Sequence, residues 1–303
     1  MVEVDYADKT IAMGVIFQDN LEFCKTLVES LLQTDLSPLS EVIVVDNFSR
    51  DGDYAEIFGG IENVHVRFIK NLKRMPLSFN RNQVFRTSVS DIIVFIDSDV
   101  KFIQKDFFKE VLHIFDEEDV SIAAPVIYDA SGRIQSFGLK RVMKLPYIFD
   151  FNFSVIPKSR INMVHGACFI VKREILLRIG GFDEYMAPYN FDEMDLVIRA
   201  EIAGYKLFAF ETLKIVHFGG GTTGHFQSSD RAFLFIRHAL RSIRRNYGGM
   251  RKIAVAFIFS LAVVVRMLFD FKNYFLHFVL LRALIYQLTD INSSSLYILH
   301  GQK

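Results

Sequence analysis

Two aspartates that follow a strongly apolar segment are the first candidates for chemistry. Residues 92–96 are all apolar, which is typical of a strand buried on both faces of a parallel sheet. Alternate residues of an extended chain point the same way, so Asp97 and Asp99 are expected to share one space. Two such carboxylates repel each other unless a cation lies between them, and oxygen ligands favour Mg²⁺ or Mn²⁺. The pattern predicts a divalent-metal site. The alternative for an isolated Asp-x-Asp sequence is a solvated turn.

The elements that must position these aspartates can be read from the preceding residues. Apolar runs predict further strands at 11–17, 42–45 and 64–69, and a helix is expected over about 78–88. Strands that alternate with helices predict an α/β fold, with a doubly wound, mostly parallel sheet flanked by helices. Ligands of such sheets bind at the carboxyl ends of the strands. The polar turn that begins at Asp46 is expected at the same edge as the two aspartates.

Charge divides the chain into two parts. Residues 1–230 carry 24 basic and 33 acidic side chains, whereas residues 231–269 carry eight basic and no acidic ones, although the formal net charge of the 303 residues is +0. We therefore predict a catalytic domain over 1–230 and a basic, apolar helical region over 231–303. The only two cysteines, Cys24 and Cys168, provide neither a disulfide framework nor metal-ligand spacing. The acidic N-terminus does not match a secretory signal.

The C-terminal region suggests a membrane surface. Residues 253–265 carry no charge, but a run of this length is too short to span a bilayer. Basic residues beside short apolar helices predict a peripheral anchor on an anionic membrane, at its cytoplasmic face. The alternative is a helical pair that packs on the catalytic domain or across a homo-oligomer. No feature of the sequence indicates a nucleic-acid partner.

Two later segments also carry candidate functional residues. Residues 192–203 predict an amphipathic helix that opens with the acids Asp192 and Glu193, and Gly204 is expected at its carboxyl end. The alternative for this segment is a well-capped structural helix. Residues 217–225 are rich in glycine and threonine, which favours either phosphate binding or a flexible surface loop.

Five segments in order resemble the nucleotide-sugar glycosyltransferases of the GT-A fold, specifically the inverting family 2. The likeness extends over about residues 10–225 and is closest to the rhamnosyltransferase-like enzymes of bacterial cell-surface polysaccharides. Its segments are 44–52 (family pattern VVDNGSTDG), 80–83 (ARNRG), 95–99 (FLDDD), 180–184 (GGFDE) and 191–205 (FEDVDL followed by RARRAGY).

This resemblance implies roles for individual residues. The nucleotide-binding residues would be Asp46, which contacts the base, and Arg81, Phe17 and Asp97; the metal ligands would be Asp97, Asp99 and His217. The general base would be Glu193 or Asp192. The acidic pair stands in the order opposite to that of the family, and the family's Thr-Tyr-Asn after the first strand is replaced by Phe17 and its two successors.

The implied reaction is inverting sugar transfer. A UDP- or dTDP-linked sugar would be the donor, a hydroxyl of a glycan or lipid-linked glycan the acceptor, and Mg²⁺ or Mn²⁺ the cofactor. One alternative is a phosphotransferase of the haloacid-dehalogenase type, in which Asp97 is the nucleophile, although that motif usually lies on the first strand. The other is a non-catalytic membrane-bound scaffold, which the intact acidic residues argue against.

Overall fold

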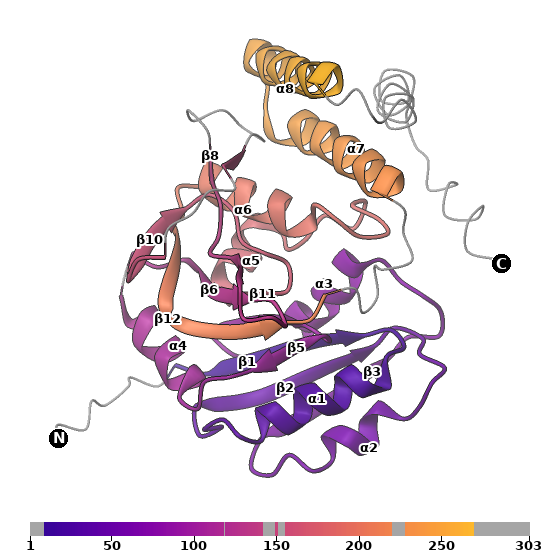
Figure 1. Cartoon of the computed structure of the whole chain (residues 1–303), viewed down its shortest axis with the longest axis vertical. Coiled ribbons are helices and arrows are strands. Elements are labelled where there is room, and N and C mark those ends of the chain that lie inside the picture. Colours follow the sequence, from indigo (N-terminus) through magenta and orange to yellow (C-terminus); the bar gives the residue numbers. More distant parts are fainter. Residues whose placement is uncertain (1–8, 118, 142–148, 151–154, 220–227, 270–303) are drawn as a thin grey trace.

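The computed structural model describes residues 9–117, 119–141, 149–150, 155–219 and 228–269. One mixed sheet crosses the molecule in the order β10-β12-β6-β11-β4-β1-β2-β3, and helices cover both of its faces (Figure 1). The segment 220–225 of the glycine-rich loop and residues 270–303 of the predicted C-terminal region lie outside the described residues.

Four parallel strands build the N-terminal half of the sheet. They are β1 (Ile11–Phe17), β2 (Leu39–Asp46), β3 (His65–Lys70) and β4 (Ile92–Asp97). Strand β1 lies between β2 and β4, and β3 pairs with the outer side of β2. The strands predicted at 11–17, 42–45, 64–69 and 92–96 are confirmed. This half has the parallel arrangement that the sequence indicates.

The other half of the sheet adds antiparallel neighbours, although six of the eight strands in the order above keep one direction, as the expectation of a mostly parallel sheet requires. Strands β6 (Ile122–Tyr128) and β12 (Leu207–His217) are parallel, but β11 (Cys168–Lys172) runs antiparallel to both β4 and β6. At the edge, β10 (Lys158–Ile161) is antiparallel to β12. Antiparallel neighbours need no crossover helix, and the described residues between β6 and β11 contain short strands but no helix. The sheet is therefore mixed.

Short strands complete the sheet and its surroundings. Strand β5 (Val100–Phe102) pairs with β12, β7 (Ile134–Ser136) pairs with β6, and β8 (Lys140–Arg141) pairs with β9 (Phe149–Asp150).

Two apolar cores lie on the two faces of the sheet. In β4, Ile92, Val94 and Ile96 enter one core while Ile93 and Phe95 enter the other, because successive side chains of a strand point to opposite faces. The first core packs against α1 (Leu21–Leu31), α2 (Tyr54–Phe58) and α4 (Phe107–Asp116). The second packs against α3 (Leu77–Thr87), α5 (Arg173–Ile179) and α6 (Asp192–Ile202).

Helix α6 shows how local sequence sets an element's ends. It begins at Asp192 and ends where Gly204 takes a left-handed conformation with φ of +89°. The amide of Gly204 donates to the carbonyl of Glu201, and that of Tyr205 donates to the carbonyl of Ala200. These two bonds satisfy carbonyls that the helix leaves unpaired, as a Schellman motif does. The predicted helix over 192–203 and its terminal glycine are confirmed.

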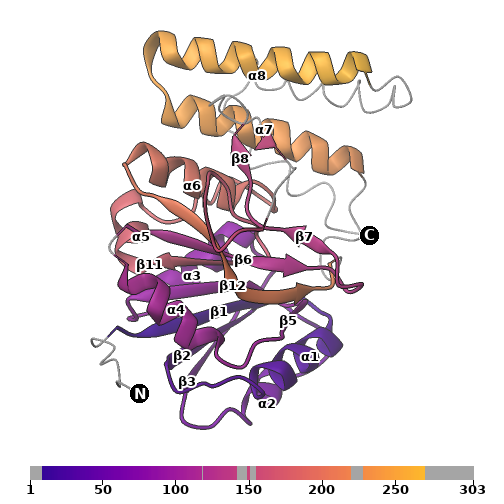
Figure 2. The ribbon, with the colours of Figure 1, turned by 60° about the vertical axis from the view of Figure 1, so that its left-hand side comes forward.

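Two further helices form an outer layer. Helix α7 (Ser228–Asn246) lies above α6, and α8 (Gly249–Phe269) lies above α7 as the outermost element (Figure 2); the three share a third apolar cluster. The predicted boundary at residue 230 falls in the first turn of α7. Among the described residues, no helix has the length and apolar character needed to cross a membrane.

Candidate active site

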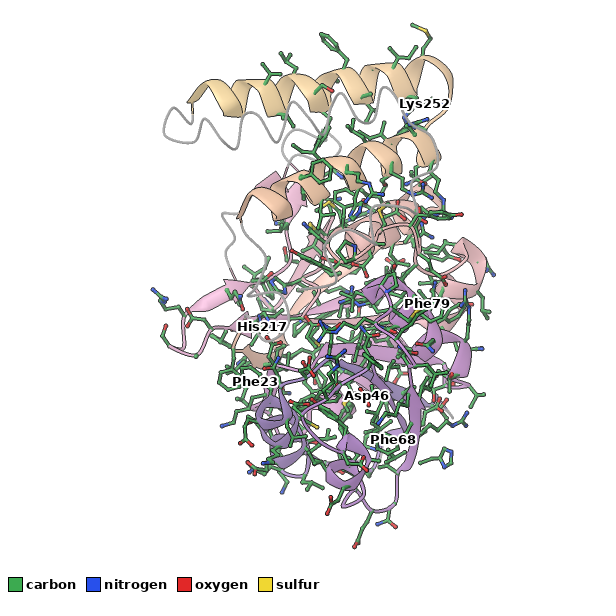
Figure 3. All side chains as sticks on the ribbon, turned by 90° about the vertical axis from the view of Figure 1, so that its right-hand side faces the viewer. Phe23, Asp46, Phe68, Phe79, His217 and Lys252 are labelled. Carbon is green, nitrogen blue, oxygen red and sulfur yellow. The ribbon has the colours of Figure 1, made fainter. Side chains whose placement is uncertain are left out.

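The strand register brings the candidate residues to one edge of the sheet. Phe17 is the register partner of Asp46, and Ile16 is that of Asp97, so β1, β2 and β4 end together. Because β11 is antiparallel, its beginning lies at this same edge, where the amide of Asp97 donates to the carbonyl of Ala167. Figure 3 looks onto this edge, with Asp46 and His217 labelled. The mixed sheet thus delivers residues from both halves of the chain to one place.

A candidate metal centre is formed by Asp97, Asp99 and His217. One ligand atom from each lies within 4.8 Å of the others. Strand β12 places His217 opposite Val100, and the Nε2 of His217 lies 3.3 Å from the Oδ1 of Asp99. The other ring nitrogen of His217 contacts the Oε1 of Gln135 at 3.0 Å, which fixes the ring. The three predicted ligands are brought together.

The electrostatics of this centre suit a divalent cation. Burial and the neighbouring charge of Asp99 raise the pKa of Asp97 to about 6, although Arg81 opposes the shift. Burial lowers the pKa of His217, but the hydrogen bond to Asp99 and the charge of Asp97 outweigh it, so the net shift is upward. Two carboxylates and one imidazole that crowd each other are a donor set suited to an ion such as Mn²⁺.

Arg81 connects the candidate metal centre with the two acids at the start of α6. Its side chain is 2% exposed and contacts Asp192 at 2.8 Å, Glu193 at 3.5 Å and Asp97 at 3.6 Å. Its Nη2 also donates to the carbonyl of Gly166 at 2.8 Å. The guanidinium lies over the rings of two buried phenylalanines, Phe169 and Phe182. Arg81 is thus a shared counter-ion in the carboxylate cluster.

The two candidate bases on α6 have different surroundings. Asp192 is fully buried against Arg81, whereas the side chain of Glu193 retains 15% exposure. Burial and the charge of Asp192 raise the pKa of Glu193 to about 8, and Arg81 acts in the opposite direction. A buried carboxylate held by a salt bridge cannot readily reach an acceptor, while a partly exposed one with a pKa near neutrality can accept a proton. The geometry favours Glu193.

A strained turn precedes α6 and is held in place by contacts from α7. Asn190 and Phe191 have positive φ values of 76° and 79°, a conformation that non-glycine residues rarely adopt. The ring of Phe191 packs edge-on against Phe235, and the Nδ1 of His238 contacts the carbonyl oxygen of Asn190 at 2.8 Å. Contacts from α7 therefore fix the point where Glu193 enters the site.

The loop after β2 is held by a network of amide side chains. The Oδ1 of Asn47 accepts from the side chain of Asn71 and from the amide of Met75, and Asn71 also donates to Asn80 at 2.7 Å. Nearby, Asp46 accepts a 2.7 Å bond from the amide of Ser49. The network ties the predicted nucleotide-binding loop to α3, which also carries Arg81. Sequence reasoning missed it, since single asparagines carry no distinctive spacing.

Phe17 requires a correction. Phe17 was predicted to bind the nucleotide, but its ring is fully buried and packs against Tyr54 and Phe58. The side chain points into the first core because Phe17 follows the same alternation as Val15. Only its backbone carbonyl faces the loop, where it accepts from the amide of Asn47.

Two further residues at the edge were not predicted. The ring of His165 lies 5.4 Å from that of His217, and burial together with the charges of His217 and Arg81 lowers its pKa to about 4. Its Nδ1 accepts from the amide of Ala167, so the neutral ring carries its proton on Nε2. A Cβ at Gly166 would lie 3.3 Å from the Oε1 of Glu193, so glycine gives the base room. The only feature of the sequence that could have indicated His165 and Gly166 is their position directly before a strand.

This fold and these residues define a class of enzyme. A mixed α/β sheet with a carboxylate–histidine cluster, a buried arginine and two helix-borne acids at one edge is the arrangement expected of a GT-A glycosyltransferase. The chain matches the family model described as Glycosyl transferase family 2 over residues 15–180, more than half of its length. The chain therefore belongs to glycosyl transferase family 2 and is an enzyme.

Solved structures support the same fold at low sequence identity. A structure of GalNAc-T7 with UDP, GalNAc and Mn²⁺ has a TM-score of 0.63 and 14% identity, covering 78% of this chain and 48% of that one. The mannosyltransferase PcManGT from Pyrobaculum calidifontis with GDP-Man and Mn²⁺ has a TM-score of 0.60 and 14% identity, covering 95% and 90%. These likenesses show the GT-A fold.

Two curated relatives are much longer than this chain. The uncharacterized protein y4gI of Sinorhizobium fredii is 26% identical over 73% of the chain, and the O-antigen biosynthesis protein RfbC of Myxococcus xanthus is 22% identical over 68%. The chain spans only 26% and 17% of their lengths.

The family assignment excludes both alternatives considered for the sequence. A phosphotransferase of the haloacid-dehalogenase type would belong to a different family, and Asp97 here ends the fourth strand of the chain instead of the first. A non-catalytic scaffold is excluded by the enzyme family.

Proposed function

We propose that this enzyme is an inverting, metal-dependent transferase that moves a sugar from a UDP- or dTDP-linked donor to a hydroxyl of a glycan or lipid-linked glycan. The observation that carries the proposal is the convergence of Asp97, Asp99 and His217 with Glu193 at one sheet edge, joined through Arg81. One base and one metal centre are the groups that a direct displacement requires.

The donor would lie across the carboxyl ends of the parallel strands. Asp46, held by Ser49 and the amide network, would accept a hydrogen bond from the nucleoside base. The diphosphate would lie toward Asp97 and Asp99. The GalNAc-T7 and PcManGT structures contain nucleotide ligands, which supports a nucleotide-sugar donor for the shared fold.

Asp97, Asp99 and His217 would hold a divalent cation, Mg²⁺ or Mn²⁺. Such a cation neutralises the charge that develops on a leaving diphosphate. The donor set fits, because two carboxylates and an imidazole already converge, and burial together with the neighbouring charge of Asp99 raises the pKa of Asp97 to about 6. Arg81, which contacts Asp97 at 3.6 Å, would limit that repulsion and keep the carboxylate in place.

Glu193 would take the proton from the acceptor hydroxyl as its oxygen attacks the anomeric carbon. Its exposed fraction allows access to the acceptor, and its raised pKa suits proton transfer near neutral pH. Asp192 and Arg81 would orient it from the buried side. The acceptor class is supported by RfbC, whose name assigns it to O-antigen biosynthesis.

A ligand panel tests this function directly. The full chain should gain thermal stability from one nucleotide sugar among UDP-, dTDP- and GDP-linked candidates, and only when Mn²⁺ or Mg²⁺ is present. Asp99→Asn should lose this gain, while Asp106→Asn should keep it, because Asp106 is exposed and lies outside the cluster. Equal stabilisation in excess chelator would refute the metal centre, and a response to no nucleotide sugar would refute the proposed donor.

A further inference from the structure

Helix α8 carries an apolar stripe that faces away from the other described helices and from the sheet. Met250, Ile253, Phe257, Leu261 and Val264 are spaced three or four residues apart and are 79%, 62%, 67%, 51% and 41% exposed. This spacing places them on one side of a helix, along a length of about 21 Å. Single exposed apolar residues are common on proteins, but a continuous row of this length marks an interaction surface.

The opposite side of α8 is buried against α7. Val255 and Phe259 are buried in the third cluster, together with Ala239 and Ile243 of α7. The inner side of α8 therefore packs on α7, and this packing holds the outer side in a fixed orientation (Figure 2). A helix held in this way lies along a surface and does not pass through one.

The charges of this region separate into two groups. Arg241 and Arg245 of α7 both bind the buried carboxylate of Asp183, at 2.9 and 3.0 Å. At the beginning of α8, Arg251 and Lys252 form no ion pair with any described residue, and the guanidinium of Arg251 lies over a tyrosine ring. Arg251 is exposed beside the apolar stripe, whereas Lys252 precedes the buried Val255 and Phe259 by three and seven residues and lies on the side of α8 that faces α7 (Figure 3).

We infer that the outer side of α8 docks on the surface of a lipid bilayer that contains anionic headgroups. The apolar stripe enters the boundary of the acyl chains, and Arg251 contacts the phosphates. Residues 231–269 contain eight cations and no acid, which is complementary to an anionic lipid surface. A second copy of this face would bring more cations together without an acidic group in that segment to pair them.

This inference goes beyond the proposed transferase activity and is measured without a donor or acceptor. The chain contains no tryptophan, so a single introduced tryptophan reports its own surroundings. Phe257→Trp in the full chain should shift its emission to shorter wavelength on addition of equimolar phosphatidylcholine–phosphatidylglycerol vesicles, and brominated lipids should quench it. Val89→Trp is the control, because Val89 is 73% exposed in the loop after α3, and its emission should not change.

Sedimentation with the same vesicles tests the two components separately. Phe257→Ser with Leu261→Ser should abolish co-sedimentation. Arg251→Gln should weaken it about fivefold, the contribution of one cation near an anionic surface, and Lys252→Gln should weaken it less, because Lys252 faces α7. High salt should release the unmodified chain, because it screens exposed charge. Val89→Ser should sediment like the unmodified chain.

Three results would overturn the inference. Emission at short wavelength without vesicles in a monomer would mean that the chain's own residues cover the stripe. The same emission in a dimer, lost on dilution, would assign the stripe to a second copy. Equal binding to vesicles of phosphatidylcholine alone would remove the role of the anionic headgroups.

Discussion

At the scale of single residues, one buried cation joins the two halves of the site. Arg81 touches a carboxylate of the candidate metal centre and both acids of α6. Without it, Asp192 would be an ionised group in the interior with no compensating charge, which is a costly arrangement. The resemblance to family 2 implied that Arg81 binds the nucleotide. The structure shows it in contact with the residues that we expect to hold the metal and accept the proton.

We predict different losses for the two acids at the start of α6. Glu193→Gln should lower turnover by about 10² to 10⁴ while leaving donor binding nearly unchanged, because it removes a positioned base. Asp192→Asn should lose less turnover but should also lower the free energy of unfolding, since it weakens the pair with Arg81. Steady-state kinetics and urea denaturation of both variants check this ranking. The reverse ranking in turnover would assign the base to Asp192.

The pH dependence of the reaction follows from the same carboxyl group. A base must be deprotonated to act, and the pKa of Glu193 is raised to about 8. Below that pH most of the enzyme carries a proton on Glu193, so kcat/KM should fall about tenfold for each unit of decreasing pH and level off above the pKa. A rate profile with saturating metal measures this. A profile that stays flat from acidic to alkaline pH would contradict the assigned base.

At the scale of elements, helix α7 is part of the catalytic domain. The buried carboxylate of Asp195 on α6 accepts from the hydroxyl of Ser242 at 2.7 Å and from the side chain of Asn246 at 3.1 Å. It also pairs with Arg199 at 2.7 Å. Helix α6 is therefore fixed from outside by a helix that was predicted to belong to a separate region.

Ser242→Ala should consequently destabilise the whole protein. It removes one hydrogen bond to a buried charge, which typically contributes about 1.5–3 kcal/mol. Ser40→Ala is a matched control, because Ser40 is exposed on β2, and its effect should be within about 0.5 kcal/mol. Chemical denaturation followed by circular dichroism gives both values. An equal, small effect of the two substitutions would show that α7 is only loosely attached.

At the scale of the whole molecule, the sequence predicted what depends on local periodicity and missed what depends on distant pairs. The parallel strands and the convergence of Asp97 with Asp99 follow from apolar runs and from alternation along an extended chain. The place of α7 does not, because Arg241 and its partner Asp183 are 58 residues apart and leave no local pattern. The antiparallel direction of β11 was missed for the same reason, since register between distant strands is not visible in a window of residues.

The integration of α7 predicts where the chain can be shortened. A chain that ends at residue 230 should fail to fold stably, because Asp183 loses both of its arginine partners on α7 and becomes an uncompensated buried charge. Asp195 keeps Arg199 but loses its hydrogen bonds from Ser242 and Asn246. A chain that ends at residue 247 keeps these contacts and should fold, although it loses α8 and with it vesicle binding. Solubility and thermal unfolding of the two chains test this. A stable, cooperative protein ending at residue 230 would restore the boundary predicted from the sequence.

The strained turn before α6 has a consequence for the order of events during synthesis. Asn190 and Phe191 hold left-handed conformations that cost free energy, and Phe235 and His238 hold them in place from more than forty positions further along the chain. A nascent chain can complete the sheet before those residues leave the ribosome, but the turn then lacks its support. The position of Glu193 therefore becomes fixed only after α7 has emerged from the ribosome. The sheet forms first, and the active site is completed last.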